Sequence, residues 1–293
     1  MDRRIRAITT DAAIQMTAIE TTQMVECARN IHRTLPLATA ALGRTLTITS
    51  ILGGQLKVDD GSVTVQVRGD GPLGTIVCVA DSDGNARGYL QNPAVDLPLR
   101  PDGKLAVGMG VGQGHLMVIK DIGLKDPVTG TVELVNGEIA EDVTRYFAES
   151  EQIPSACALG VLVNQDQSVR QAGGYLVQLL PGAADADIDR LEQNIAKAGS
   201  MTGMLDSGMS LEDIVRAVLD GFTVQFLDET PVGYRCACNE AKVTRALISL
   251  GEQELLQMAG EDKPTEITCQ FCDKVYTFSP ADLRDLAANA RKK

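Results

Sequence analysis

The sequence predicts an α+β fold in three parts: a core of mixed strands and helices over residues 1–181, an acidic helical linker over 182–230 and a small cysteine-containing domain over 231–293. Strand-like alternation and helical periodicity are interspersed in the first part without a strict βα repeat, which favours α+β over a doubly wound sheet. The second part changes in charge and glycine content, and the third contains four closely spaced cysteines. Because 44% of the residues are hydrophobic but only 3% are aromatic, the core must be aliphatic.

The first part opens with strand patterns. Apolar side chains occupy every second position at residues 14–18, and they do so more regularly at 63–67, just before an Asp-Gly-Pro turn. Such alternation is typical of half-buried strands. Further strands are expected at 75–79, 87–91 and 116–122, the first two joined as a hairpin through 81–85.

Two helices are predicted in the same part. One spans about Thr21 to Ile31, and the other places Ile139, Val143 and Tyr146 on one face. The second helix must end before Pro154, because the residue before a proline is disfavoured in helical geometry.

A glycine-rich segment, 108–114, resembles a phosphate-binding loop only superficially. Its glycines fall at every second residue, and a strand pattern rather than a helix follows, so neither GxGxxG nor a P-loop register is present. We expect an extended segment whose glycines permit close backbone packing. His32 and His115 are the only histidines and lie near no nucleophile motif, so no catalytic residue is assigned.

The second part carries ten acidic residues against three basic ones, with glycines and methionines between short helical patterns. One helix spans 188–195 and ends at Gly199, and another spans 211–219 and ends at Gly221. Ser210 and Asp213 are spaced as in a capping box. Short acidic helices of this kind depend on packing against neighbours, so the segment is predicted to be metastable.

The third part contains two cysteine pairs, Cys236-Ala237-Cys238 and Cys269-Gln270-Phe271-Cys272. Asn239 can cap a helix running to about Leu250, which would place the first pair at a helix N-terminus. The second pair would lie in a turn before a strand at 274–278. Ser279 and Pro280 then begin a final helix.

Four cysteines in two short-spaced pairs are typical ligands of zinc. Zinc takes four thiolates in a tetrahedron with Zn–S distances of about 2.3 Å, and such a site has no open position for substrate. The sequence therefore predicts one bound zinc ion, held by Cys236, Cys238, Cys269 and Cys272.

The same thiols can be oxidised. A CxxC pair reaches disulfide geometry in a turn, whereas a CxC pair closes a smaller and more strained ring. We therefore predict that Cys269–Cys272 oxidises before Cys236–Cys238. Loss of two thiolates would leave zinc with too few ligands, so the metal and the folding energy it supplies would be lost together.

Charge and composition exclude several classes of protein. A net charge of −12 disfavours a nucleic-acid partner, because it repels phosphate backbones. The most apolar stretch, 35–52, is interrupted by Arg44 and threonines, and no secretory leader pattern is visible, so no membrane association is expected. Seven cysteines, with Cys27, Cys78 and Cys157 isolated in apolar patterns, do not form a secreted disulfide framework, and a cytoplasmic location is expected.

Specific motifs give the chain a family resemblance over nearly its whole length. The CxC and CxxC pairs stand in the settings Val232-Gly233-Tyr234-Arg235 and Thr268-Cys269, and the chain resembles the redox-regulated bacterial heat-shock chaperones of about thirty-three kilodaltons, the 33 kDa chaperonin family. Upstream segments that carry the resemblance are residues 89–93, 150–155, 159–163 and 172–182.

The resemblance implies a function. It implies an ATP-independent holdase that binds unfolding or oxidatively damaged client proteins, is inactive when reduced and zinc-bound, and dimerises when oxidised. It also implies that neighbouring cysteines pair, as Cys236–Cys238 and Cys269–Cys272, that zinc is released and that the linker unfolds.

Two other functions remain open from the residues. One is a dithiol–disulfide oxidoreductase that uses Cys269 and Cys272, although this CxxC does not begin a helix in a βαβ unit. The other is an inert zinc staple in a nucleic-acid or translation factor, which the net charge disfavours.

Overall fold

The structure is a computed structural model that describes residues 1–261 and 263–290. The chain divides into two compact units, residues 1–235 and 236–293. Strands and helices are interspersed in both units, so the predicted α+β class is confirmed.

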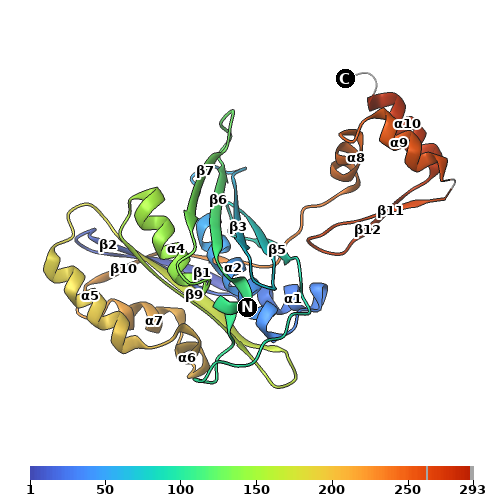
Figure 1. The fold of residues 1–293 in the computed structure, drawn as a ribbon. Coiled ribbons are helices and arrows are strands. Elements are labelled where there is room, and N and C mark those ends of the chain that lie inside the picture. Colours follow the sequence, from blue (N-terminus) through green and yellow to red (C-terminus); the bar gives the residue numbers. More distant parts are fainter. Residues whose placement is uncertain (262, 291–293) are drawn as a thin grey trace. The chain divides into compact units, whose positions relative to one another are not determined.

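Two five-stranded antiparallel sheets form the first unit (Figure 1). The strands predicted at residues 14–18, 63–67 and 116–122 and the hairpin at 75–91 are confirmed. Sheet A has the order β10 (Val224–Pro231), β1 (Arg3–Thr9), β2 (Ile14–Glu20), β9 (Val169–Leu179) and β8 (Ser155–Val163). Sheet B has the order β5 (Ala86–Leu90), β4 (Thr75–Asp81), β3 (Ser62–Gly69), β6 (Gly114–Asp121) and β7 (Val128–Glu133).

Helix α2 (Pro36–Gly53) packs against strands of both sheets and is buried on nearly every side. Its threonine hydroxyls donate hydrogen bonds to backbone carbonyls one turn earlier in the helix. Thr45 donates to the carbonyl of Ala41 at 2.9 Å, and Thr47 donates to that of Gly43 at 2.8 Å. The apolar stretch at 35–52 is thus a core helix. In the described part of the chain, no helix combines the length and the apolar character needed to cross a bilayer.

Both helices predicted in the first part are present, and a third helix lies where an extended segment was predicted. Helices α1 (Thr22–His32) and α4 (Ala140–Tyr146) are confirmed, and a π-helical turn, Phe147–Glu151, extends α4 toward Pro154. The expectation of an extended glycine-rich segment is wrong, because residues Val107–Val111 form the short helix α3. Close packing there is confirmed: a Cβ added at Gly110 would lie 2.8 Å from the Leu73 side chain.

The acidic segment after Leu180 covers the second face of sheet A. It forms α5 (Asp185–Ala198), α6 (Met201–Asp206), α7 (Leu211–Val218) and then β10, which joins the sheet as an edge strand beside β1 (Figure 1). The two predicted helices and the capping box at Ser210 are confirmed, whereas α6 and β10 were not predicted. These elements cluster with the first compact unit, and the three-part division of the chain stays a prediction.

Sheet A therefore has apolar side chains on both faces. Along β9, Leu176 faces the α2 core, while Tyr175 and Val177 face the acidic segment. The inner face of α7 contributes four of the most buried side chains of the second core: Leu211, Ile214, Val215 and Val218. Packing against sheet A is thus the main source of stability for these short helices.

Arginines of β1 hold the acidic segment by ion pairs. Arg3 donates two hydrogen bonds of 2.7 Å to the carboxylate of Glu212 on α7 and lies 3.3 Å from Glu229 on β10. Arg6 pairs with Asp228 on β10. These contacts join residues more than 200 positions apart, so they add to sheet pairing in holding the segment closed.

We expect Arg3→Met to loosen the acidic segment selectively. A bidentate pair at the surface contributes about 1 kcal/mol, so amide hydrogen exchange should become several-fold faster in α7 and β10 but not in α2. Glu149→Gln, which breaks the exposed pair with Arg145, is the matched control and should change neither. Unchanged protection of α7 in Arg3→Met would show that the pair adds nothing.

The same pair sets a pH dependence. The hydrogen bonds from Arg3 lower the pKa of Glu212 to about 2, below its ordinary value of 4.5. A carboxyl whose folded-state pKa is depressed contributes stability above its unfolded pKa and loses it as the pH falls toward the folded value. Hydrogen exchange of α7 should therefore quicken, relative to α2, between about pH 4.5 and 2.

The second unit is small and has a thin core. It contains α8 (Glu240–Ile248), α9 (Glu252–Gly260), the hairpin β11 (Thr265–Thr268) and β12 (Val275–Phe278), and α10 (Pro280–Ala290). The predicted helix after Asn239, the strand and the final helix are confirmed, although Gly251 separates α8 from a helix that was not predicted, α9. Among the residues of this unit that the structure describes, the buried hydrophobic ones are Leu247, Leu255, Ala259, Tyr276, Phe278, Leu283 and Ala287.

Candidate metal centre

The first cysteine pair lies directly before α8. The side chain of Asn239 accepts a hydrogen bond of 2.9 Å from the backbone N–H of Lys242 and so fixes the start of the helix. The Lys242 ammonium donates to the carbonyl of Ala237, between the two cysteines, at 2.9 Å. These contacts attach the CxC segment to the start of α8, so the predicted position of the first pair at a helix N-terminus is confirmed.

The second pair lies in the tight turn that joins β11 to β12. The carbonyl of Cys269 accepts from the backbone N–H groups of Cys272 at 3.3 Å and Asp273 at 2.9 Å, and Asp273 has a left-handed φ of 56°. The turn directs both sulfurs to the same side. A hairpin position also differs from the helix N-terminus that a thioredoxin-like CxxC requires.

All four sulfurs meet at one point. The Sγ atoms of Cys236, Cys238, Cys269 and Cys272 lie within 4.8 Å of one another. The Sγ of Cys236 is 3.8 Å from that of Cys269, and the Sγ of Cys238 is 3.4 Å from that of Cys272. Four thiolates at about 2.3 Å from a central ion are about 3.8 Å apart at tetrahedral angles, so the spacing fits zinc.

A tyrosine that the sequence analysis missed completes the cluster. The Tyr276 hydroxyl on β12 donates a hydrogen bond of 3.1 Å to the Sγ of Cys238. Desolvation opposes ionisation, but this bond and those from the other thiols lower the pKa of Cys238 to about 7. Desolvation raises the pKa of Cys272 to about 12. The alternation of β12, which turns Tyr276 and Phe278 inward, was the available signal.

The cluster also adds stability to a small domain. Seven buried hydrophobic side chains in the described part of the second unit form its core, and Cys238 and Cys269 pack against them. A core of this size gives little stability, and small domains of this kind commonly depend on a structural metal. Removing two thiolates should therefore cost this unit much of its fold.

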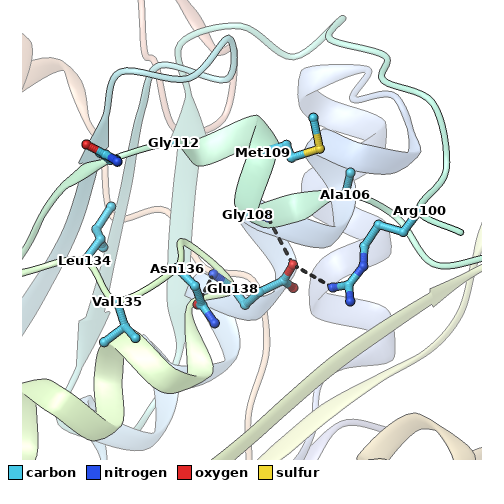
Figure 2. A pocket seen from close by; sticks show the side chains of 10 residues that line it. Arg100, Ala106, Gly108, Met109, Gly112, Leu134, Val135, Asn136 and Glu138 are labelled. Carbon is cyan, nitrogen blue, oxygen red and sulfur yellow. Dashed lines mark hydrogen bonds and ion pairs between the residues drawn. The ribbon is translucent and has the colours of Figure 1, made fainter. Parts of the chain in front are cut away.

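The glycine-rich segment borders a hollow that does not resemble a second site. Glu138 accepts there from the backbone N–H of Gly108 at 3.2 Å and from Arg100 at 3.3 Å (Figure 2). Its other oxygen accepts from Arg44 at 2.6 Å. The Glu138 carboxylate and the backbone N–H of Gly108 are thus both used in hydrogen bonds within the fold.

The remaining cysteines and both histidines lie outside the four-cysteine cluster. Cys27 is exposed, Cys78 is buried, and burial raises the pKa of both Cys78 and Cys157. His32 hydrogen-bonds to the Tyr234 hydroxyl at 3.3 Å, and His115 is exposed on β6. None of these residues belongs to the group whose ligand atoms converge in the described structure.

Comparison with known protein families shows to which family the chain belongs. The family model described as Hsp33 protein matches residues 2–279. The chain belongs to the Hsp33 family. Among Hsp33 relatives, a protein named 33 kDa chaperonin from Desulforamulus reducens is 44% identical over 292 residues, covering 100% of this chain and 99% of that protein. One of the same name from Clostridioides difficile is 47% identical over 286 residues, covering 97% and 98%.

A solved Hsp33 structure has the same fold. The crystal structure of the 33 kDa chaperonin from Thermotoga maritima matches with a TM-score of 0.91 at 34% identity, and the match covers 99% of both chains. The α+β architecture and the cysteine-containing unit are therefore those of an Hsp33 protein.

Proposed function

We propose that this protein is a redox-regulated, ATP-independent chaperone that holds unfolding or oxidatively damaged proteins in solution. The observation that carries the proposal is the convergence of four cysteine sulfurs in a unit with a thin core. Membership of the Hsp33 family, whose relatives are named chaperonins, supports the chaperone activity. The reduced form with one zinc ion would be inactive.

Oxidation would open the site by removing its ligands. We propose that Cys269 pairs with Cys272 and Cys236 with Cys238. For each disulfide, two thiols lose two protons and two electrons, and one molecule of peroxide accepts them and becomes two of water. Bound zinc supplies folding energy of about 10–16 kcal/mol in small domains, comparable with the stability of a whole domain.

A short docked segment connects the cysteines to the acidic segment. Between Cys236 and the end of β10, the backbone of Arg235 donates to the carbonyl of Ala86 at 2.9 Å, and Ala86 donates back to Gly233 at 3.1 Å. The Tyr234 hydroxyl donates to the carbonyl of Gly88 at 3.0 Å. Disorder that begins at Cys236 would reach β10 by breaking the contacts of this segment.

Release of the acidic segment would expose the surface that binds clients. The face of sheet A under α5–α7 is apolar and includes Ile5, Ile14, Met16, Tyr175 and Val177. An exposed apolar face of this kind binds unfolded chains. The net charge of −12 would keep the complex with a client in solution.

The remaining partners and the location are part of the same proposal. We expect a homodimer in the oxidised form, no nucleic-acid or membrane partner, no catalytic residues and a cytoplasmic location. Reducing conditions there would keep the thiols available for zinc.

The decisive experiment measures three quantities on one sample. Zinc content, free thiols and suppression of aggregation of a heat-denatured test protein are followed before and after peroxide with mild heating. We expect about one zinc per chain before treatment, loss of four thiols with the zinc, and protection that rises in parallel. Equal protection by the reduced zinc form, or protection that begins while zinc stays bound, would contradict the coupling.

The alternative function is a dithiol–disulfide oxidoreductase. The position of Cys269 and Cys272 in a β-hairpin, rather than at a helix N-terminus, disfavours it. Catalytic turnover in insulin reduction would favour it over the chaperone proposal.

A further inference from the structure

Two methionines lie where the acidic segment meets sheet A. Met201 and Met204 are on α6, which packs against β8 and β9, and their side chains are 2% and 5% exposed. Both belong to the hydrophobic core between the acidic segment and the sheet. A thioether can be oxidised to a sulfoxide, so these two sulfurs are oxidisable groups that the proposed cysteine chemistry does not use.

Helix α6 lies over a pair of glycines in the sheet. Gly160 on β8 and Gly173 on β9 are paired across the two strands. A Cβ added at Gly173 would lie 3.1 Å from the terminal methyl carbon of Met201, and a Cβ added at Gly160 would lie 2.6 Å from the side chain of Thr202. The helix thus lies directly on the backbone of the sheet, and the thioether of Met201 is packed closely against it.

We infer that Met201 and Met204 are a second oxidation site: they are protected while the acidic segment is docked, and peroxide converts them to methionine sulfoxide once the segment is released, which keeps the segment from docking again. The inference rests on the proposed function. In this step the thioether sulfur takes one oxygen atom from peroxide, the O–O bond breaks, and the other oxygen leaves as water with both protons. The sulfoxide is polar, and burial of a polar group in an apolar core disfavours docking.

The two kinds of oxidation would differ in how they are reversed. A disulfide is reduced by thiol exchange, after which the four cysteines can bind zinc again. A sulfoxide is reduced by a separate class of enzyme, the methionine sulfoxide reductases. A chain that has been oxidised at both sites would therefore keep its apolar face exposed after its thiols are reduced, so brief and prolonged exposure to oxidant would have different consequences.

Other methionines of the same chain serve as internal controls. Met109 on α3 is 71% exposed, so peroxide should reach it whether or not the acidic segment is docked. Met24 on α1 is 1% exposed and belongs to the core around α2, which release of the segment should leave intact. Protection that changes only for Met201 and Met204 is thus specific to the acidic segment.

The first measurement compares rates of methionine oxidation in two forms of the full-length protein. One form is reduced with zinc bound, and in the other diamide has converted the thiols to disulfides under mild heating, which leaves thioethers unoxidised. Both receive the same brief pulse of peroxide, and mass spectrometry follows each methionine. We expect Met201 and Met204 to react at least about tenfold faster in the disulfide form, while Met109 and Met24 keep their rates. Equal rates for Met201 and Met204 in the two forms would overturn the inference.

The second measurement asks whether the sulfoxides keep the segment open. The disulfide form, with and without the pulse of peroxide, is reduced with dithiothreitol, supplied with zinc and assayed for suppression of aggregation. We expect the sample without peroxide to lose its protection and the sample with peroxide to keep most of it. A double variant, Met201→Leu with Met204→Leu, conserves side-chain volume and should lose protection in both samples.

Two results of the second measurement would overturn the inference. One is loss of protection by the wild-type protein that carries both sulfoxides, because the modified segment would then dock normally. The other is persistent protection by the double variant after peroxide, because the effect would then come from another oxidised group.

The same samples separate this inference from the proposed function. If the disulfide form protects no test protein and α6 keeps its hydrogen-exchange protection, the proposed function fails. The rates are then compared in Ile214→Asp, in which a buried carboxylate releases the segment without oxidant. Faster oxidation of Met201 and Met204 in this variant than in the wild type would support the second site, and equal rates would overturn it. If the disulfide form protects test proteins but closes again with both sulfoxides present, the proposed function stands and the inference fails.

Discussion

An Ile214→Asp substitution should turn the reduced, zinc-loaded protein into a chaperone that needs no oxidant. Ile214 lies on the inner face of α7 with no exposed surface, packed against sheet A. A carboxylate cannot be buried there without a partner, so the acidic segment should leave the sheet. Suppression of aggregation by the reduced protein should then approach that of the oxidised wild type.

Graded variants separate release of the segment from general unfolding. Ile214→Ala leaves a cavity that costs about 2–5 kcal/mol, so its effect should lie between those of wild type and Ile214→Asp. Leu124→Asp makes the same kind of change at a position that is 59% exposed and should have no effect. Hydrogen exchange should rise in α5–α7 while the buried helix α2 stays protected.

Two results would contradict this prediction. If α7 in Ile214→Asp keeps its protection, the packing against sheet A is not what holds the segment. If the segment opens but no protection against aggregation appears, the apolar face of sheet A is not the surface that binds clients.

Local signals in the sequence were sufficient for many elements of this fold. The capping box at Ser210, the Asn239 cap and the alternation at residues 63–67 each depend on neighbours within four positions, and the structure contains all three elements. Helix α2 was recognised only as a stretch too polar for a membrane. A helix between two sheets is apolar on every side, so it lacks the one-sided periodicity that identifies surface helices.

Pairings between distant segments could not be predicted from one sequence. Strand β10 is mostly exposed, so its alternation is weak, and its partner β1 lies more than 200 residues away. The acidic segment was therefore predicted as helical only. Its ion pairs with Arg3 and Arg6 join residues more than 200 positions apart, so they too have no local signal in the sequence.

The candidate site was predicted more fully than the fold around it. Cysteine spacing alone indicates four ligands for one ion, and the structure brings these sulfurs within 4.8 Å. Tyr276 was missed because its role depends on the hairpin that carries its hydroxyl to Cys238. The alternation of β12 indicates that Tyr276 faces inward, but it does not indicate which sulfur its hydroxyl reaches.

Cys272→Ser should abolish stoichiometric zinc binding. A hydroxyl replaces one of four soft ligands, and since loss of an outer-shell partner alone costs about 10–100-fold in affinity, loss of a ligand should cost at least about 1,000-fold. Chelator titration followed by metal analysis would measure the change. Cys27→Ser makes the same chemical change at an exposed cysteine outside the cluster and should bind zinc as wild type does.

Hydrogen exchange in Cys272→Ser then decides whether the cluster only stabilises the second unit or also controls the acidic segment. Amides of α8, α9 and α10 should lose protection, because their thin core depends on the ligands. A cluster that only stabilises the second unit would leave hydrogen exchange in the first unit unchanged. If the cysteines control the chaperone, α5–α7 should open as well while α2 stays protected, since disorder that reaches the segment Val232–Arg235 frees the end of β10. Full protection of α5–α7 after loss of the metal would separate zinc binding from the release of the client surface.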